Sequence, residues 1–397
     1  MKHTFFIIIS FLICTFSYGQ NQNSGFDFKQ AEQVVERAMR QRINDAETQE
    51  RVCTIASYVG VYQFNSRRYT AAIRTLEYAI SHSRKNNEVI QIQNHVFLTH
   101  ALCLTRNRSA LSRLQNLVLI FQDFQKNTVR GNFPVEYADA MRGAMNELLL
   151  PLTSLVSRTF PDNETLHYCF NLMLYLKQFS FYQLGNKTEA EIKHSLYLDY
   201  RKLLSAKLRK EDVAIEFVPC MDITGTHVNG TYYVAYILDH KGNLRFVEVC
   251  NKKDVEALYQ YNETSWNLYG RQSSQLSTMV WKKLTPFLTG KKRIFLSPCG
   301  ILNRVNFLLF DTRVHELSST CELTKTYKRN PHSNAVLIGD IDYDNSIKSI
   351  LRGDRDWGML SGTKLEVESI SKTLSNRYTV TTLTKNNGSE QTVRRLC

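Results

Sequence analysis

The sequence has few of the residues that interrupt helices. It contains 17 glycines and 7 prolines in 397 residues, and between residues 26 and 210 proline occurs only at positions 134, 151 and 161. Glycine and proline are the strongest breakers of regular structure, so their scarcity in the first half favours long helices there. The composition, with 43% hydrophobic and 22% charged residues, excludes a collagen-like or low-complexity chain and is typical of a globular protein.

Closely paired cysteines are also absent. The nine cysteines are spread along the chain without a Cys-x-x-Cys pair, and a structural zinc site requires ligands at such close spacing. We therefore expect no metal site and no cofactor. Most of the cysteines are interpreted as small residues of the core.

The chain lacks a dense basic segment, although its net charge is +13, with 50 basic and 37 acidic residues. The densest basic runs, RKNN, KLRKED and GKKR, are short. A nucleic-acid-binding surface should instead gather basic residues on one element, with aromatic rings on which bases can stack. We therefore expect a basic, solvated surface and no nucleic-acid partner.

Residues 1–19 have the pattern of a secretory signal peptide. A short basic start, MKH, precedes the apolar run TFFIIISFLICTF, which is too short to span a membrane comfortably. The small residues Ser17 and Gly19 then stand three positions and one position before a cleavage site at Gln20. This boundary resembles the export signals of Bacteroidetes-type bacteria. We expect a mature chain that is periplasmic or extracellular and has no membrane partner.

Residues 20–210 show the periodicity of helices. In the segment IASYVGVYQFNSRRYTAAIRTLEYAI, the small residues Gly60, Ala72 and Ala79 stand where two antiparallel helices must approach closely. This spacing resembles a tetratricopeptide (TPR) repeat, which has small residues at its eighth, twentieth and twenty-seventh positions. The next unit, NHVFLTHALCLTRNRSALSRLQNLV, has a similar helix-turn-helix rhythm without those small residues. The resemblance implies a helical solenoid that binds a protein or peptide partner.

A stripe of large apolar residues, YCFNLMLYLKQFSFY, occurs later in this helical part. Such a stripe is compatible with a cofactor-binding surface. A helix buried inside a solenoid explains it better, because apolar residues around most of a helix are typical of burial.

Strand-like segments begin near Asp212. They are rich in β-branched and aromatic residues and alternate with helical segments towards the end of the chain, which predicts a parallel or mixed sheet covered on both faces. Residues 239–243 are predicted to be the hairpin turn between the second and third strands. The predicted strands are VAIEFVP, TYYVAYIL, LRFVEV, KRIFLSP, AVLIGD and YTVTTLT.

Ligands of such sheets gather at the carboxyl ends of the strands. Cys299 follows the strand KRIFLSP, so it is a candidate nucleophile with His315 or His332 as its base. The alternative, which the Pro-x-Gly pattern favours, is that Cys299 is only a turn residue. The acidic residues of GDIDYD (Asp340, Asp342 and Asp344) invite a metal-site interpretation, but they lack the glycine and closing glutamate of a calcium loop. Solvated loop acids are favoured, and no catalytic residue is assigned.

Six segments of residues 212–397 resemble, in order, those of a CHAT domain, a caspase-like cysteine peptidase domain commonly found behind TPR helices. They are DVAIEFV, IFLSPCGILNRVNFLLF, ELSSTCEL, AVLIGDIDYD, LSGTKLEVESI and TVTTLTKNNGSEQTVRRL. Two signatures carry most of the resemblance, Pro-Asp-Gly-x-Leu-x-x-Ile-Pro-Phe after a strand and Leu-Pro-Gly-Thr-x-x-Glu. The segment after the first turn is expected to bury Leu302, Val305 and Phe307.

The chain departs from both signatures. Cys299 replaces the acid of the turn, Asn306 replaces the proline before Phe307, and Ser361 replaces the proline before Gly362. In the family, the catalytic His-Gly and Cys motifs follow the segment that corresponds to TVRRL. The sequence given ends at Cys397, within the helix that should precede the histidine strand, so Cys397 is not expected to be the nucleophile.

The resulting prediction is an α plus α/β protein. It consists of a signal peptide at residues 1–19, a TPR-like solenoid at 20–210 and the N-terminal part of a CHAT domain at 211–397. The resemblance implies a cysteine peptidase that is inactive in this chain because the catalytic pair is missing. The alternative is a non-catalytic, TPR-type protein-binding scaffold. Unpaired strand edges and an apolar helix face are expected to leave an isolated 212–397 fragment marginally stable.

Overall fold

The computed structural model describes residues 27–41, 43–83, 88–129, 148–181, 198–224, 227–260, 273–325, 334–340, 361–388 and 392. The predicted signal peptide, residues 1–19, lies outside the described residues. His332, Asp342, Asp344 and Cys397 lie outside them as well.

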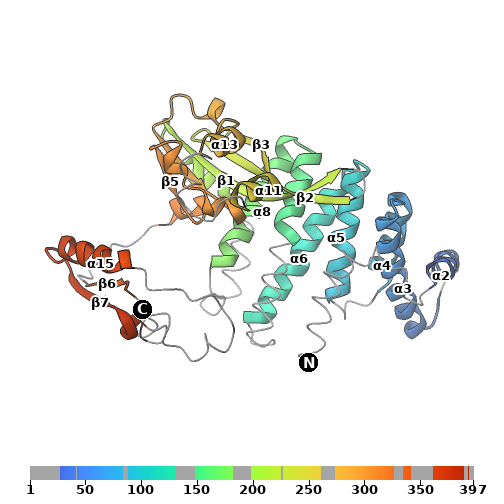
Figure 1. Cartoon of the computed structure of the whole chain (residues 1–397). Helices are drawn as coiled ribbons and strands as arrows, with labels where there is room; N and C mark the ends of the chain where they lie inside the picture. The colour runs from blue at the N-terminus through green and yellow to red at the C-terminus, as the bar shows by residue number, and fades with distance from the viewer. Residues whose placement is uncertain are drawn as a thin grey trace. The chain divides into compact units, whose positions relative to one another are not determined.

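The protein is a mixed helical and sheet structure with two compact units, Met1–Lys325 and Thr326–Cys397 (Figure 1). Helices form the first half of the first unit, and a sheet follows. Of the helices described, none combines the length and the apolar character that crossing a membrane requires.

Several helices of the first unit begin at an aspartate cap. The Asp27 carboxylate accepts a hydrogen bond from the Lys29 amide at 3.0 Å, and Asp45 accepts one from the Thr48 amide at 2.7 Å. Such caps satisfy amide groups that have no partner inside the helix. The helices are α2 (Phe28–Arg40), α3 (Ala46–Asn65), α4 (Tyr69–His82), α5 (Glu88–Leu104), α6 (Ser109–Val129), α8 (Asn163–Phe181) and α10 (Tyr200–Ser205), and residues 148–159 are also helical.

Helices α3 and α4 pack closely together at Gly60. A Cβ atom on Gly60 would lie 2.6 Å from Cγ of Leu76, closer than side chains tolerate. Ala72 and Ala79 on α4 are fully buried. The three small residues that the sequence singles out therefore all lie buried in this helical hairpin.

The turns of α3–α4 and α5–α6 have the same backbone geometry. Arg67 and Arg106 both adopt left-handed conformations, with φ of 68° and 53°. In each turn this residue and the next donate amide hydrogen bonds back to the last turn of the preceding helix, over 2.8–3.0 Å. This closure of a helix C-terminus usually uses glycine, because a side chain is strained at positive φ. The two hairpins are thus built alike, with arginine in the strained position of each.

The sheet of the first unit has five strands in the order β3-β2-β1-β4-β5. β1, β2 and β3 pair antiparallel, whereas β4 pairs parallel with β1 and β5 parallel with β4. The predicted hairpin turn at residues 239–243 is confirmed, and the Asp239 carboxylate accepts hydrogen bonds from the amides of Lys241 and Asn243. The strands are β1 (Asp212–Thr224), β2 (His227–Asp239), β3 (Leu244–Asn251), β4 (Arg293–Ser297) and β5 (Val314–Glu316).

Short helices surround the strands of this sheet. They are α11 (Lys252–Gln260), α13 (Ser273–Leu276), η3 (Ser277–Trp281), η4 (Thr285–Phe287), η5 (Gly300–Arg304), η6 (Phe307–Leu309) and η7 (Thr320–Thr324). They contribute to a core on one face of the sheet, where Ile215 and Phe217 of β1 pack with Trp281 and Phe307.

The other face of the sheet packs against the long helices, and Figure 1 shows β1 and β2 lying beside α8. Tyr236 of β2 is fully buried there, with its ring 5.7 Å from that of Phe170 and its hydroxyl 2.5 Å from Ser157 Oγ. The change from helix to strand occurs between Ser205 and Asp212, close to the boundary expected at residue 210. The helices and the sheet nevertheless share one core, so the compact unit continues to Lys325.

The second unit is a small βαβ arrangement. β6 (Asn334–Ile338) and β7 (Thr379–Leu383) pair in parallel, and α15 (Ser361–Leu374) lies between them in sequence, with η8 (Lys385–Gly388) after β7. A Cβ on Gly339 would lie 2.4 Å from Val367 of α15, so this glycine allows the helix to pack closely. Val336, Ile338, Leu365 and Ile370 are large apolar residues that stay exposed in this unit.

Helix α5 buries an unusual number of polar side chains. Asn94 donates a hydrogen bond to Ser57 Oγ at 2.9 Å, and the His100 ring lies 3.0 Å from the Val96 carbonyl and 3.0 Å from Met221 Sδ of β1. Burial lowers the pKa of His95 to about 4, with a contribution from Arg113, and burial also lowers the pKa of His100 to about 4. Both imidazoles are therefore neutral in the folded chain at physiological pH.

Replacing Arg67 or Arg106 by glycine should stabilise the protein by about 0.5–1 kcal/mol each, because glycine relieves the positive-φ strain. As a control, Arg74→Gly changes an exposed residue inside α4 and should cost about 1 kcal/mol. Urea unfolding of the three variants tests this. A loss of stability at the turn positions similar to that of Arg74→Gly would refute the strain argument.

Acidification should destabilise the first unit through His95 and His100. The pKa of each histidine is about 4 in the folded chain and 6.5 in the unfolded chain. Between pH 4 and pH 6.5 the unfolded chain therefore binds more protons than the folded chain. The free energy of unfolding therefore falls as the pH drops from 6.5 towards 4, by up to about 3 kcal/mol per histidine. Urea unfolding at several pH values should show a weaker pH dependence for His95→Gln/His100→Gln. An unchanged slope in that variant would contradict this assignment.

Candidate functional site

The turn after β4 lies at the carboxyl end of that strand, where ligands of such sheets gather. Gly300 has φ of 54°, and a Cβ there would lie 2.5 Å from Tyr233 Oη. The Tyr233 hydroxyl accepts a hydrogen bond from the Ile301 amide at 3.2 Å. Glycine is thus required on both steric and conformational grounds. Leu302, Val305 and Phe307 are buried, as predicted.

Cys299 in this turn has the properties of a packing residue. It is only partly exposed and contacts the apolar core on its face of the sheet. Burial raises the pKa of its thiol to about 12, and the nearby Lys177 ammonium offsets only part of that effect. Because the thiolate is the nucleophilic form, a thiol that stays protonated at neutral pH is poorly suited to attack a carbonyl.

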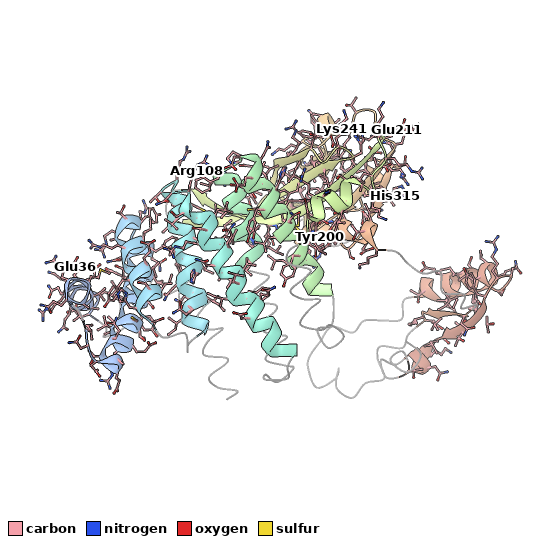
Figure 2. All side chains as sticks on the ribbon, turned by 180° about the vertical axis from the view of Figure 1, so that it is seen from behind. Glu36, Arg108, Tyr200, Glu211, Lys241 and His315 are labelled. Atoms are coloured by element: carbon pink, nitrogen blue, oxygen red, sulfur yellow. The ribbon has the colours of Figure 1, made fainter. Side chains whose placement is uncertain are left out.

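The proposed base is not joined to Cys299. His315 lies on β5, exposed to solvent, with its ring 5.5 Å from that of Phe295 on the neighbouring strand (Figure 2). Within the described ranges no hydrogen bond connects His315 with Cys299. The described residues therefore do not assemble the cysteine–histidine pair that the sequence left open, and His332 lies outside them.

A buried polar network lies beneath this turn. The Lys177 ammonium on α8 is 2.5 Å from Glu216 Oε2 on β1 and donates a hydrogen bond to Ser297 Oγ at 3.0 Å. Glu216 Oε1 accepts further hydrogen bonds from the Ser319 hydroxyl at 3.0 Å and from the hydroxyl and amide of Thr320. The Lys177 and Glu216 side chains are 7% and 1% exposed. Four elements, α8, β1, β4 and η7, therefore meet at one ion pair.

A lysine beside a serine hydroxyl can activate the serine for nucleophilic attack. Here the hydroxyl of Ser297 is fully buried and itself donates to the Ser318 carbonyl at 3.0 Å. The Lys177 ammonium is already held by Glu216 Oε2 and Ser297 Oγ. The arrangement holds α8 against β1 and β4, and it gives a substrate no access to these atoms.

Sequence reasoning missed this ion pair, although a signal was present. Lys177 is the only charged residue in the apolar stripe YCFNLMLYLKQFSFY, and Glu216 is the only one in VAIEFVP. A lone charge in an apolar segment indicates a buried partner, because an unpaired charge is rarely buried. Which partner it meets depends on the tertiary fold.

The acidic segment after β6 does not form a metal site in the described part of the chain. Asp340 is 5% exposed and has φ of 52°, its amide donates to Thr363 Oγ1 at 2.9 Å, and its carbonyl accepts from the Lys385 amide at 2.7 Å. No group of three potential metal ligands occurs among the residues described. Asp342 and Asp344 lie outside them.

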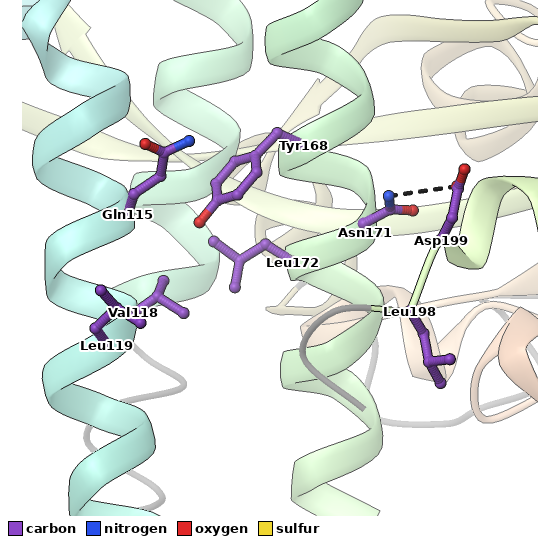
Figure 3. A pocket seen from close by; sticks show the side chains of 8 residues that line it. All are labelled: Gln115, Val118, Leu119, Tyr168, Asn171, Leu172, Leu198 and Asp199. Carbon is purple, nitrogen blue, oxygen red and sulfur yellow. Dashed lines mark hydrogen bonds between the residues drawn. The ribbon is translucent and has the colours of Figure 1, made fainter. Parts of the chain in front are cut away.

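A pocket of about 470 Å³ opens between α6 and α8 (Figure 3). Its walls combine aliphatic side chains with a polar edge. Val118 and Leu172 are buried, whereas Leu119 is 46% exposed at the opening. The lining residues are Gln115, Val118, Leu119, Tyr168, Asn171, Leu172, Leu198 and Asp199.

Hydrogen bonds fix the polar edge of this pocket. The side-chain Nδ2 of Asn171 donates a hydrogen bond to Asp199 Oδ1 at 3.5 Å, which Figure 3 marks with a dashed line. The side-chain Oδ1 of Asn171 accepts a hydrogen bond from the backbone amide of Arg201 at 3.0 Å. Asp199 also caps α10 through the Lys202 amide at 3.1 Å. The pocket volume is within the range of ligand-binding clefts, and an apolar wall with a few fixed polar groups is their usual composition.

No family model, no curated protein and no solved structure matches this chain. The TPR and CHAT resemblances therefore stay predictions, and the geometry of the described residues is the basis for a function.

Breaking the buried ion pair should destabilise the first unit strongly. Lys177→Met leaves the Glu216 carboxylate buried without its counter-charge, at an expected cost of about 3–5 kcal/mol. Lys177→Met/Glu216→Gln should recover part of that loss because no charge is left unpaired. Lys252→Met, which breaks an exposed ion pair with Glu256, should cost about 0.5 kcal/mol. Equal losses for Lys177→Met and Lys252→Met in urea unfolding would contradict the role of the buried pair.

Proposed function

We propose that this chain is a non-catalytic binding protein of the TPR-CHAT type, exported from the cell, whose helical part binds a segment of another protein. The observation that carries the proposal is the pocket between α6 and α8, with its aliphatic wall and fixed polar edge. It lies in the helical part of the chain, where the TPR resemblance leads us to expect a protein or peptide partner.

The chemistry of the lining favours a polypeptide segment. Val118, Leu119 and Leu172 offer an apolar surface for one inserted side chain, and burying such a side chain contributes about 1.5–3 kcal/mol. The exposed Gln115 carboxamide at the rim can both donate and accept hydrogen bonds. This combination matches a side chain flanked by peptide groups.

The peptidase activity implied by the CHAT resemblance has less support among the described residues. Burial keeps the Cys299 thiol protonated, and the Lys177–Ser297 arrangement is sealed from solvent. A cysteine peptidase requires a thiolate, an activating histidine and donors for the oxyanion. We therefore rank binding above catalysis for the chain as given.

The pocket can be tested with peptides selected from a random display library against the full chain. Leu119→Glu should weaken binding of the selected peptide at least about tenfold, because it places a charge on the apolar wall. Leu308→Glu is the matched control, since Leu308 is 50% exposed on η6 and does not line the pocket. Selection of no peptide, or equal weakening by both substitutions, would overturn the proposal.

The ranking of binding above catalysis predicts that the chain does not cleave peptide substrates by using Cys299. Incubation with a mixed peptide library and mass spectrometry should give the same products for the wild-type chain and for Cys299→Ala. Cleavage that disappears in Cys299→Ala would show that this thiol is a nucleophile and would contradict the packing role assigned to it.

A further inference from the structure

Two turns that are separate in sequence form one basic surface in the fold. We define the turn face as Arg67 and Arg68 of the α3–α4 turn with Arg106 and Arg108 of the α5–α6 turn. The two turns lie at the same end of the helices, because the last turn of α3 packs on the C-terminal half of α5. The ring of Phe64 lies 5.2 Å from that of Phe97 and 6.2 Å from that of His100. Arg108 lies at this end of the helices (Figure 2).

The charges of the turn face are only partly neutralised. Arg68 forms an ion pair with Glu32, and Arg108 reaches Asp162 only at 3.8 Å while its side chain stays 82% exposed. Arg67 and Arg106 are exposed, and neither has a carboxylate within ion-pair distance in the part of the chain that the structure describes. Two guanidinium groups are therefore available to a partner on the same end of the helical part.

The backbone gives a second reason to assign a role to Arg67 and Arg106. Both hold left-handed conformations that glycine adopts without strain, with φ of 68° and 53°. A positive charge at a helix C-terminus interacts favourably with the helix dipole, but the adjacent Arg68 and Arg108 already supply that charge. Strained residues that recur at equivalent positions are typical of functional surfaces.

We propose that the turn face binds an acidic segment of a protein partner, with Arg67 and Arg106 pairing with its carboxylates. Guanidinium groups match carboxylates in bidentate geometry, which favours this chemistry. Nucleic acid fits less well, because the rings of Phe64 and Phe97 are buried, and the more exposed Tyr62 ring is already stacked on Phe28 and covered by Arg68. None of the four arginines lines the α6–α8 pocket, so the proposal can hold or fail independently of that site.

The test is a titration of a fluorescent, Glu-rich peptide with the full chain at low and moderate salt. Arg67→Gly/Arg106→Gly should weaken binding about fivefold while raising stability, so loss of binding cannot be attributed to unfolding. Arg67→Asn/Arg106→Asn removes the same charges with a residue that tolerates positive φ and should weaken binding equally. Arg67→Lys/Arg106→Lys keeps the charges but loses the bidentate geometry, so it should weaken binding less than the glycine variant does, and moderate salt should reduce the affinity of the wild-type chain.

Arg245→Ala/Lys253→Ala is the control for net charge, since both side chains are exposed on other elements. It should change the affinity less than twofold. An equal loss in this control would show that only the overall charge matters and would overturn the proposal, as would absence of peptide binding. Tighter binding of a single-stranded oligonucleotide or of anionic vesicles, with the same dependence on Arg67 and Arg106, would assign the surface to another class of partner.

Discussion

The buried pair of Lys177 and Glu216 constrains the first unit more than any other interaction described. Neither charge can be left alone out of water, so α8 must stay in register with β1, and Ser297 fixes β4 to the same point. The hydroxyl groups of Ser319 and Thr320 complete the carboxylate's hydrogen bonds and hold η7 in place. Four elements from distant parts of the sequence are thus tied together at one buried site.

This constraint bears on function in two ways. It fills the carboxyl end of β4, which pairs with β1 at Glu216, with structural hydrogen bonds. Sheets of this kind often place ligands at such strand ends, so little room is left there for chemistry. It also fixes the orientation of α8, whose earlier turns present Tyr168, Asn171 and Leu172 to the pocket beside α6. A pocket wall held by a buried ion pair is pre-organised, which lowers the entropic cost of binding a partner segment.

Much of the local structure could be predicted from the sequence. Periodicity and β-branched content indicate the long helices, the strands other than β5 and the 239–243 turn, and the CHAT resemblance implies the burial of Leu302 and Phe307. These features depend on residues close together in the chain. The change from helical to strand-like sequence near residue 210 is equally clear in the sequence. In the structure it marks a change of secondary structure inside one compact unit.

The functional features could not be predicted in the same way, because each joins distant segments. Lys177 meets Glu216, Asn171 meets Asp199, and α3 meets α5 through the packing of Phe64 on His100. Each basic run of the sequence is too short to form a binding surface by itself. Only the fold brings the arginines of two separate turns to the same end of the helices. The position of Cys299 makes it a candidate nucleophile, although the Pro-x-Gly pattern favours a turn residue. The burial that raises the pKa of its thiol is a property of the fold.

The central claim is that the long helices and the sheet form one cooperative unit that is held at the buried ion pair. Native-state hydrogen exchange of the full chain, measured amide by amide with increasing denaturant, tests it most directly. The account predicts that amides of α8, β1 and β4 merge into a single opening with one free energy. Exchange of α8 through a separate, lower-energy opening while β1 and β4 stay protected would contradict it.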